Sequence, residues 1–282
     1  MIINLSDGRV FLDYGPMQMM LAASANGRDM ASELRQAADY AIKNLKELAV
    51  VQELAKDVRT VNKPDLTGVS LPLQLMIEAV KAAGDETLTP MAAVAGTFAD
   101  MAADLLVAKG ASKVLINNGG DIAIRLAVGE KTSVGLTPGI DSADFTHVIS
   151  IEGKDGIGGV TTSGLGGRSF TKGIASAVTV LAHTAREADA CATVIANHCY
   201  TEDPGIIRLP AEKIDPNTDI PGHLVTVRFE KLKPETKEKA LANGLAKAKE
   251  LISKGVIHGV VIFLGSLIAM LPDGLCQSRY KE

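Results

Sequence analysis

The stretch "SKVLINNGGDIAIRLAV" at residues 112–128 holds two apolar segments on either side of Asn-Asn-Gly-Gly-Asp. Each segment is rich in Val, Ile and Leu and has the length of one strand. Asn and Gly tolerate positive φ angles, so Gly119 and Gly120 predict a tight turn between two antiparallel strands. A second interpretation stays open, in which the glycines let a ligand approach the backbone and Asp121 presents a carboxylate beside it.

A helix is expected before this hairpin, and further strands after it. Thr89 and Pro90 supply an N-cap and a first helical residue, and Gly110 ends the helix after Lys109. Apolar segments predict later strands at 132–137, 145–153, 159–164 and 175–183. The stretch "KELISKGVIHGVVIFLGSLIAML" at 249–271 resembles 104–126 in its helix end, Lys-Gly stop and two strands. We interpret the pair either as a duplicated helix–strand–strand unit or as a chance recurrence.

The rest of the chain is arranged around these segments. Helical patterns cover 29–58, 73–83 and 186–197, and residues 9–25 predict two strands that turn at Gly15-Pro16. Four prolines and several acidic residues make 201–222 a long surface connection. We expect one domain over 1–282, with two lobes as an alternative. Its parts are a motif-bearing core at 91–200, the connection, and a C-terminal strand–helix–strand unit at 223–282.

Composition limits the classes of partner. The net charge is −4, acidic and basic residues are mixed, and no basic stripe is present, which argues against a nucleic-acid surface. The longest apolar run, 256–271, is interrupted by His258 and two glycines and is shorter than the roughly 20 residues of a membrane span. We therefore predict core strands there and no membrane segment. Three cysteines without a pairing pattern, and no N-terminal signal pattern, predict a reduced, cytoplasmic protein.

The glycine-rich segment at 153–173 is a candidate ligand site. "GKDGIGGVTTSGLGGRSFTKG" has eight glycines in 21 residues. Free backbone N–H groups in such a loop form an anion-binding concavity, to which Arg168 or Lys172 would add positive charge. The spacing matches neither the phosphate-loop pattern nor the dinucleotide-binding pattern. A flexible surface loop stays the alternative.

Asp189 and Thr193 stand four residues apart in "READACATVIAN" at 186–197. In a helix this spacing puts the carboxylate and the hydroxyl on one face. Two hard oxygens suit a partial Mg²⁺ site completed by water, backbone carbonyls and substrate phosphate, with Asp121 as a further carboxylate. The alternative is a first-turn acid that interacts with the helix dipole. No zinc-ligand spacing links the cysteines and histidines. Three histidines in or beside predicted strands are interpreted as structural: His147, His183 and His223.

Six motifs in register, within about 91–200, resemble the ApbE family of Mg²⁺-dependent flavin transferases, which move FMN from FAD onto a protein threonine. They are Gly96 with Asp100, the Gly110 stop, "NNGGDI" at 117–122, "TTSG" at 161–164, "AVTV" at 177–180 and "ADACAT" at 188–193. Further matches resemble an ApbE-related branch without established function. These are "GPM" at 15–17, "PMAAVAG" at 90–96, "GGRS" at 166–169 and "IAN" at 195–197.

The resemblance implies an α+β fold with an extensive, mostly antiparallel sheet and packed helices. In the transferases the Asp and Thr of the last motif bind Mg²⁺ at the FAD pyrophosphate, and Asp189 and Thr193 match them. A flavin nucleotide or another phosphate compound is the expected ligand, and a homodimer is a further expectation. The expected ligand-binding residues are Gly119, Gly120, Asp121, Thr162, Ser163, Gly164 and Arg168.

Two departures from the transferases leave the activity open. Ala95 stands where they have a lysine, and "GGRSFTKGIAS" at 166–176 replaces their His-x-x-Asp-Pro-x-x-Gly segment. Three hypotheses follow. The chain is a Mg²⁺-dependent transferase or hydrolase that cleaves a pyrophosphate, a non-catalytic binder of flavin or nucleotide, or a structural protein on the same scaffold.

Overall fold

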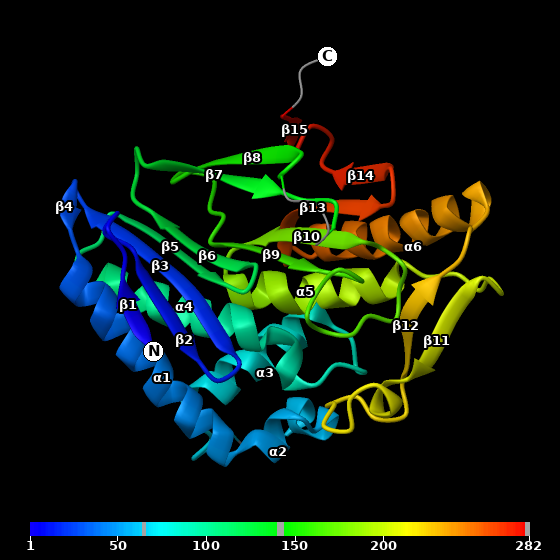
Figure 1. The fold of residues 1–282 in the computed structure, drawn as a ribbon, viewed down its shortest axis with the longest axis horizontal. Coiled ribbons are helices and arrows are strands. Elements are labelled where there is room, and N and C mark those ends of the chain that lie inside the picture. The colour runs from blue at the N-terminus through cyan, green and yellow to red at the C-terminus, as the bar shows by residue number, and fades with distance from the viewer. Residues whose placement is uncertain (64–65, 140–143, 280–282) are drawn as a thin grey trace.

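The structure is a computed structural model that describes residues 1–63, 66–139 and 144–279. Its centre is a ten-stranded sheet (Figure 1). The tenth strand, β4 (Arg28–Asp29), pairs only with β3 and lies off the main path. The other nine strands follow one another in the order β1 (Ile2–Asn4), β2 (Val10–Tyr14), β3 (Met17–Ala25), β5 (Lys113–Asn118), β6 (Asp121–Leu126), β9 (Gly159–Ser163), β10 (Ala177–Ala182), β13 (Ile257–Leu264) and β14 (Leu267–Leu271). All neighbours pair antiparallel. The expected α+β fold with an antiparallel sheet is confirmed.

Helices cover one face of this sheet, below it in Figure 1. They are α1 (Ala31–Val50), α3 (Leu71–Ala83), α4 (Val94–Ala108), α5 (Ala185–His198) and α6 (Pro234–Ser253). The main hydrophobic core fills the space between the helices and the sheet, with Leu21, Ile116, Val180 and Ile262 from the strands and Phe98 from α4. This core places α4 and α5 side by side under the central strands.

A smaller sheet covers part of the opposite face and consists of β7 (Lys131–Leu136), β8 (His147–Glu152) and β15 (Gln277–Ser278). A second core lies between the two sheets, where Leu181 and Phe263 of the large sheet meet Val134 and Ile151 of the small one. Because β10 and β13 are covered on both faces, their sequences are apolar almost without alternation. The prediction that 256–271 forms strands is confirmed, and β13 is a core strand, whereas β14 is an edge strand whose side chains are only partly buried.

The hairpin predicted in 112–128 is confirmed. Asn118 of β5 pairs with Asp121 of β6, and Gly119 and Gly120 turn the chain with φ angles of +70° and +114°. Near the C-terminus, α6, β13 and β14 again form a helix followed by an antiparallel hairpin. The sequence recurrence at 104–126 and 249–271 therefore falls on the same order of elements, and a duplication stays a hypothesis.

Three predicted segments differ in detail from the structure. The long helix expected at 29–58 ends at Val50, where two adjacent β-branched valines lower the helix propensity, and Gln52–Ala55 forms a separate short helix, α2.

The second segment is the start of the helix predicted after Thr89. Thr89 precedes the 3₁₀ turn Pro90–Ala93, but its hydroxyl donates to the Asp219 carboxylate and does not cap the turn.

The third segment, 201–222, holds a strand that the sequence pattern did not indicate. This strand, β11 (Ile206–Pro210), pairs with β12 (Leu224–Phe229). Its terminal proline is tolerated because both strands of a two-stranded sheet are edge strands.

Pro90–Ala108 is the one helical stretch in the described residues that is long and apolar enough to cross a membrane by length and composition. In the structure it packs against α5 and strands β5 and β6. Ala99, Ala102 and Ala103 are fully buried there. Its apolar composition is therefore explained by its place in the main core.

Candidate functional site

Asp189 and Thr193 lie on α5, which begins and ends within one residue of the predicted helix. Thr184 fixes its start, because the Thr184 hydroxyl accepts a hydrogen bond from the Glu187 N–H at 3.2 Å and donates to the Glu187 carboxylate at 2.9 Å. The first of these bonds is the N-cap bond of a capping box, while the Glu187 carboxylate meets the Thr184 hydroxyl and not its backbone N–H. The helix packs against β9 and β10, so it holds both side chains under the centre of the sheet.

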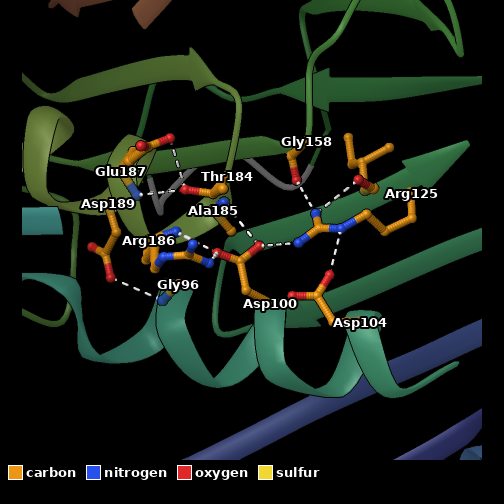
Figure 2. A network of polar contacts seen from close by, with 11 residues as sticks. Gly96, Asp100, Asp104, Arg125, Gly158, Thr184, Ala185, Arg186, Glu187 and Asp189 are labelled. Carbon is orange, nitrogen blue, oxygen red and sulfur yellow. Dashed lines mark hydrogen bonds and ion pairs between the residues drawn. The ribbon is translucent and has the colours of Figure 1, made fainter. Parts of the chain in front are cut away.

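Helices α4 and α5 cap each other's N-terminus (Figure 2). The Asp100 carboxylate accepts hydrogen bonds from the N–H groups of Ala185 and Arg186 at 3.0 and 2.9 Å, and Asp189 accepts one from Gly96 at 2.9 Å. The first N–H groups of a helix have no partner inside it, and a carboxylate there also interacts favourably with the dipole. The helices approach so closely that a Cβ on Gly96 would lie 2.3 Å from the Ala185 carbonyl oxygen.

Asp100 is fully buried, and its charge is balanced by two arginines. Arg125 contacts one carboxylate oxygen at 2.8 Å, and Arg186 contacts the other at 3.1 Å. Arg125 also binds Asp104 at 2.8 Å and the Gly158 carbonyl at 2.9 Å. Each Asp100 oxygen thus accepts two hydrogen bonds, one from a guanidinium and one from the start of α5. The Asp100 carboxylate of this motif therefore stabilises the fold.

Asp121 and Asp189 form a second group of carboxyls, which the fold brings together from β6 and α5. Burial raises the pKa of Asp121 to about 7, against the lowering effects of a backbone hydrogen bond from Thr162 and the charge of Arg168. Burial, followed by the negative charge of Asp121, raises the pKa of Asp189 well above its ordinary value. Two carboxyls that disfavour each other's ionisation in this way favour a shared proton or a bound cation.

Buried hydroxyls without partners lie on the same side of the sheet. Val160 of β9 belongs to the second core, so strand alternation puts Thr161 and Ser163 on the face toward α5. Within the described residues, the hydroxyls of Thr161, Ser163 and Thr97 are buried and have no hydrogen-bond partner. Buried hydroxyls usually find a partner, so these oxygens are consistent with a further group bound nearby.

The glycine turn and the end of β9 line one cavity, of about 250 Å³. Predicted site residues Gly119, Gly120, Thr162 and Ser163 all line it, together with Gly166 and Gly167. Arg168 lies against this wall, because its guanidinium nitrogen is 3.1 Å from the place a Cβ on Gly119 would occupy. The guanidinium also donates to the Gln18 amide oxygen at 2.8 Å.

The expected anion-binding loop differs from the sequence interpretation. The N–H groups of Leu165, Gly166 and Gly167 donate to the backbone carbonyls of Ala175, Ser176 and Gly164 at 3.0, 3.2 and 2.9 Å. The segment folds back on residues 175–176, with Gly164 at a φ of +134°, so these three N–H groups are not free for an anion. For them the prediction is wrong.

Thr193 lines a second cavity, of about 290 Å³, together with Arg168, Lys172 and Asn197. Arg168 lines this second cavity and lies against Gly119, which lines the first. The Lys172 ammonium donates to the Thr87 hydroxyl at 3.0 Å, and burial lowers the pKa of Lys172. The cationic side chains that line this cavity are Lys56, Arg168 and Lys172, and the acidic ones are Asp215 and Asp219.

Gln18 was missed by the sequence interpretation, since it binds Arg168 from 150 residues away in the chain. Thr97 and Thr161 were missed because only packing reveals that their hydroxyls lack partners. Among the described residues, no group of three or more His, Cys, Asp and Glu side chains is placed to hold a metal. The expected set of Asp121, Asp189 and Thr193 has two carboxylates and a hydroxyl, so the magnesium site stays a prediction.

A model of the family described as "AbpE bacteria" matches residues 3–274. The chain belongs to this family. The resemblance of its motifs to an ApbE-related branch without established function is thereby confirmed. This AbpE-family chain is 41% identical over 114 residues to a UPF0280 protein of Methanothermobacter thermautotrophicus, which is 40% of this chain and 44% of that protein. The chain spans about half the length of the curated relatives it matches.

One solved structure shows a similar fold. The crystal structure of the ApbE protein from Thermotoga maritima matches with a TM-score of 0.52 at 14% identity, over 95% of this chain and 96% of that one. The apo form of the flavinyl transferase ApbE from Pseudomonas stutzeri matches 69% of this chain and 83% of that one at 16% identity, with a TM-score of 0.36. The similarity to the Thermotoga maritima protein is therefore one of fold.

Proposed function

We propose that this AbpE-family protein binds the pyrophosphate of a flavin dinucleotide, or of a related nucleotide, together with Mg²⁺ at Asp189, Thr193 and Asp121. One observation carries the proposal. Two interacting carboxyl groups, from the start of β6 and the first half of α5, lie close to the charge of Arg168, which lines a cavity together with Thr193.

The residues present fit a magnesium ion. Mg²⁺ prefers oxygen ligands, takes few of them from the protein, and keeps positions for water and phosphate. Asp189 accepts backbone hydrogen bonds from Ala95 and Gly96, and a carboxylate has about four lone-pair sites, which leaves sites for a cation. The unpartnered hydroxyls of Thr161 and Ser163 add oxygens on the same face of the sheet.

The chain's own residues would bind and orient the ligand. Arg168 and Lys172 would pair with phosphate oxygens, and a guanidinium does so through two parallel hydrogen bonds. The bare backbone at Gly119 and Gly120 lets a ligand approach the hairpin closely. A bound Mg²⁺ would supply Lewis-acid polarisation of a phosphate oxygen. That polarisation would support attack by a water molecule on the pyrophosphate, so that FAD and water give FMN and AMP.

The test is calorimetric titration of EDTA-treated protein with FAD, with and without Mg²⁺, alongside chromatography for released FMN. The informative variant is Asp189→Asn, because an amide oxygen still accepts the Gly96 hydrogen bond while the charge is lost. We expect it to weaken Mg²⁺-dependent FAD binding at least about tenfold, the typical effect of losing one charge-assisted contact. Asp104→Asn, with a 57% exposed side chain on α4, is the matched control. Equal Mg²⁺-dependent binding by Asp189→Asn and the wild type would falsify the proposal.

Binding without cleavage is the second candidate, and the residue at position 95 favours it. Where the transferases have a lysine, this chain has Ala95, whose carbonyl accepts a hydrogen bond from the Asn118 amide at 3.1 Å. A ligand that binds only the folded state raises the unfolding temperature whether or not it reacts. If FAD raises the unfolding temperature in the presence of Mg²⁺ and is then recovered intact, the result supports binding without cleavage.

A further inference from the structure

A pair of histidines lies outside the carboxylate site, where β10 ends and β13 begins. The His183 and His258 rings have their centroids 4.2 Å apart and are inclined at 75°. His183 Nδ1 lies 3.1 Å from His258 Nε2, and the Gly156 carbonyl oxygen lies 3.1 and 3.2 Å from these two nitrogens. Three electron-pair donors thus form a nearly equilateral triangle.

The strand pairing aims His258 at this point. Leu181 pairs with Gly259 and Ala182 with Ile257, so His258 is the extra residue of a β-bulge. A bulge redirects the side chain of the extra residue, and bulges are frequent next to functional sites. His183 directly follows the last residue of β10, on the paired strand.

The loop between β8 and β9 places the Gly156 carbonyl group beside the two histidine rings. The Gly158 N–H donates to the Ala182 carbonyl at 2.9 Å, which fastens the loop to the end of β10. A Cβ on Gly158 would lie 2.0 Å from the His183 carbonyl oxygen, so only glycine permits this approach. Gly156 itself has a φ of +70°. Three segments far apart in the sequence therefore fix the triangle.

Hydrogen bonding alone does not satisfy these three atoms. A carbonyl oxygen only accepts, and each neutral imidazole nitrogen carries either a proton or a lone pair. If both nitrogens carry protons, the contact between the rings joins two donors. If only one does, at least one contact joins two lone pairs. With the rings oriented as in the structure, at least one contact of the triangle is unfavourable in every neutral arrangement, and a cation that accepts all three lone pairs removes that conflict.

The triangle has the dimensions of a metal site. Atoms 3.1–3.2 Å apart lie about 1.8 Å from their common centre, so an ion about 1 Å above their plane has bonds of about 2.0–2.1 Å. We propose that His183, His258 and the Gly156 carbonyl bind a divalent transition-metal ion of the zinc type. Imidazole suits Zn²⁺, Cu²⁺ and Ni²⁺, whereas Mg²⁺ prefers oxygen, so this site and the carboxylate site select different cations.

The surroundings leave room for entry and for a further ligand. His183 is exposed and His258 is partly exposed. His183 and Gly156 line a cavity of about 360 Å³, toward which open coordination positions can face. The negative charges of Asp155 and Glu187 act on His258 and favour a cation. Three protein ligands with an open position are the pattern of catalytic zinc sites, whereas structural sites are closed by four.

The test titrates EDTA-treated full-length protein with ZnCl₂ in a calorimeter, in a buffer with excess Mg²⁺ to occupy oxygen sites. We expect one Zn²⁺ per chain. His183→Ala and His258→Ala should each weaken binding by more than about tenfold, because removing even an indirect partner of a metal ligand costs that much. His198→Ala is the matched control, since its ring is exposed and bonds to the Val194 carbonyl of its own helix at 2.9 Å.

A spectroscopic measurement identifies the ligands. Electron paramagnetic resonance of the Cu²⁺-loaded protein should show coupling to nitrogens of two imidazoles in the wild type and of one in each single variant. Unchanged Zn²⁺ affinity in the double variant, or a Cu²⁺ spectrum without imidazole coupling, would overturn the proposal. Asp189→Asn should retain full Zn²⁺ binding. A failure of the histidine site is therefore distinguishable from a failure of the carboxylate site.

Discussion

Asp189 on α5 accepts a hydrogen bond at 2.9 Å from the N–H of Gly96 on α4, 93 residues earlier in the chain. Asp100, one helical turn after Gly96, binds the start of α5 in return. The motif residues Gly96 and Asp100 thus meet the motif residue Asp189 in one reciprocal contact. Fold and candidate site are coupled there, because the carboxylate proposed to bind Mg²⁺ also caps a core helix.

Gly96→Ala should destabilise the protein although alanine favours helices by about 1 kcal/mol over glycine. The new Cβ would lie 2.3 Å from the Ala185 carbonyl oxygen, a backbone atom that moves only if the two helices separate. We expect the free energy of unfolding to fall by about 1–3 kcal/mol, as for other overpacked cores.

Urea denaturation measures this change, with Gly244→Ala as the comparison. A Cβ on Gly244 would lie 2.3 Å from the Cys199 Sγ, a side-chain atom, so the loss should be smaller. A Gly96→Ala protein as stable as the wild type would show that the helices separate at little cost.

Asp100→Ala should cost about 3–5 kcal/mol of unfolding free energy, the usual effect of removing one partner from a buried ion pair. It leaves the guanidinium groups of Arg125 and Arg186 without their shared carboxylate and two N–H groups of α5 without an acceptor. Asp100→Asn should lose less, because its amide oxygen still accepts. Asp104→Ala removes an exposed partner of Arg125 and should cost less than about 1 kcal/mol. Similar losses for Asp100→Ala and Asp104→Ala, measured by urea denaturation, would contradict the assigned roles.

Local patterns were sufficient to predict the elements that carry the site. The hairpin at Gly119-Gly120 and helix α5 follow from turn chemistry and helical periodicity, which act over a few residues. The strand β11 was missed because Pro210 ends it and acidic residues flank it. Its pairing with β12 is a tertiary contact that no local pattern encodes.

The environments of the candidate site residues could not be predicted from the sequence. The motifs single out Asp121, Asp189, Ser163 and Arg168 as candidates, but their interactions depend on tertiary contacts. The backbone of Gly166 was expected to be free, yet it donates to the Ser176 carbonyl, because that bond depends on how the segment folds back. The pairing of His183 with His258 likewise depends on a bulge in β13, which leaves no mark in the sequence.

The stability of the metal-free protein should fall as the pH rises from about 4 to about 7. Burial raises the pKa of Asp121 from 3.8 to about 7, so the folded state holds this proton over a range in which the unfolded state has lost it. A state that binds more protons is favoured at low pH, and the effect ends above the folded pKa. The pKa of Asp189 is raised as well, which adds to the slope with the same sign.

Urea midpoints at pH 5, 6, 7 and 8, in EDTA, measure this dependence. Asp121→Asn should flatten the slope, since the amide does not titrate. Added Mg²⁺ should raise the midpoint at pH 8 more than at pH 5, where protons compete for the carboxyls. An identical slope in the wild type and Asp121→Asn would show that this carboxyl keeps its ordinary pKa.

Ser163→Ala should separate stability from ligand binding. The Ser163 hydroxyl is buried without a partner, and an unsatisfied buried polar group costs about 1–3 kcal/mol, so its removal should leave stability unchanged or raise it. Because Ser163 lines the glycine cavity, we expect FAD binding with Mg²⁺ to weaken nonetheless. Thr60→Val is the matched control, since the Thr60 hydroxyl is also buried and unpartnered but lies in the 3₁₀ helix Val58–Asn62. Thermal melting with and without FAD measures both quantities in one experiment. Equal ligand-induced shifts in the two variants would mean that the Ser163 hydroxyl makes no contact with the nucleotide.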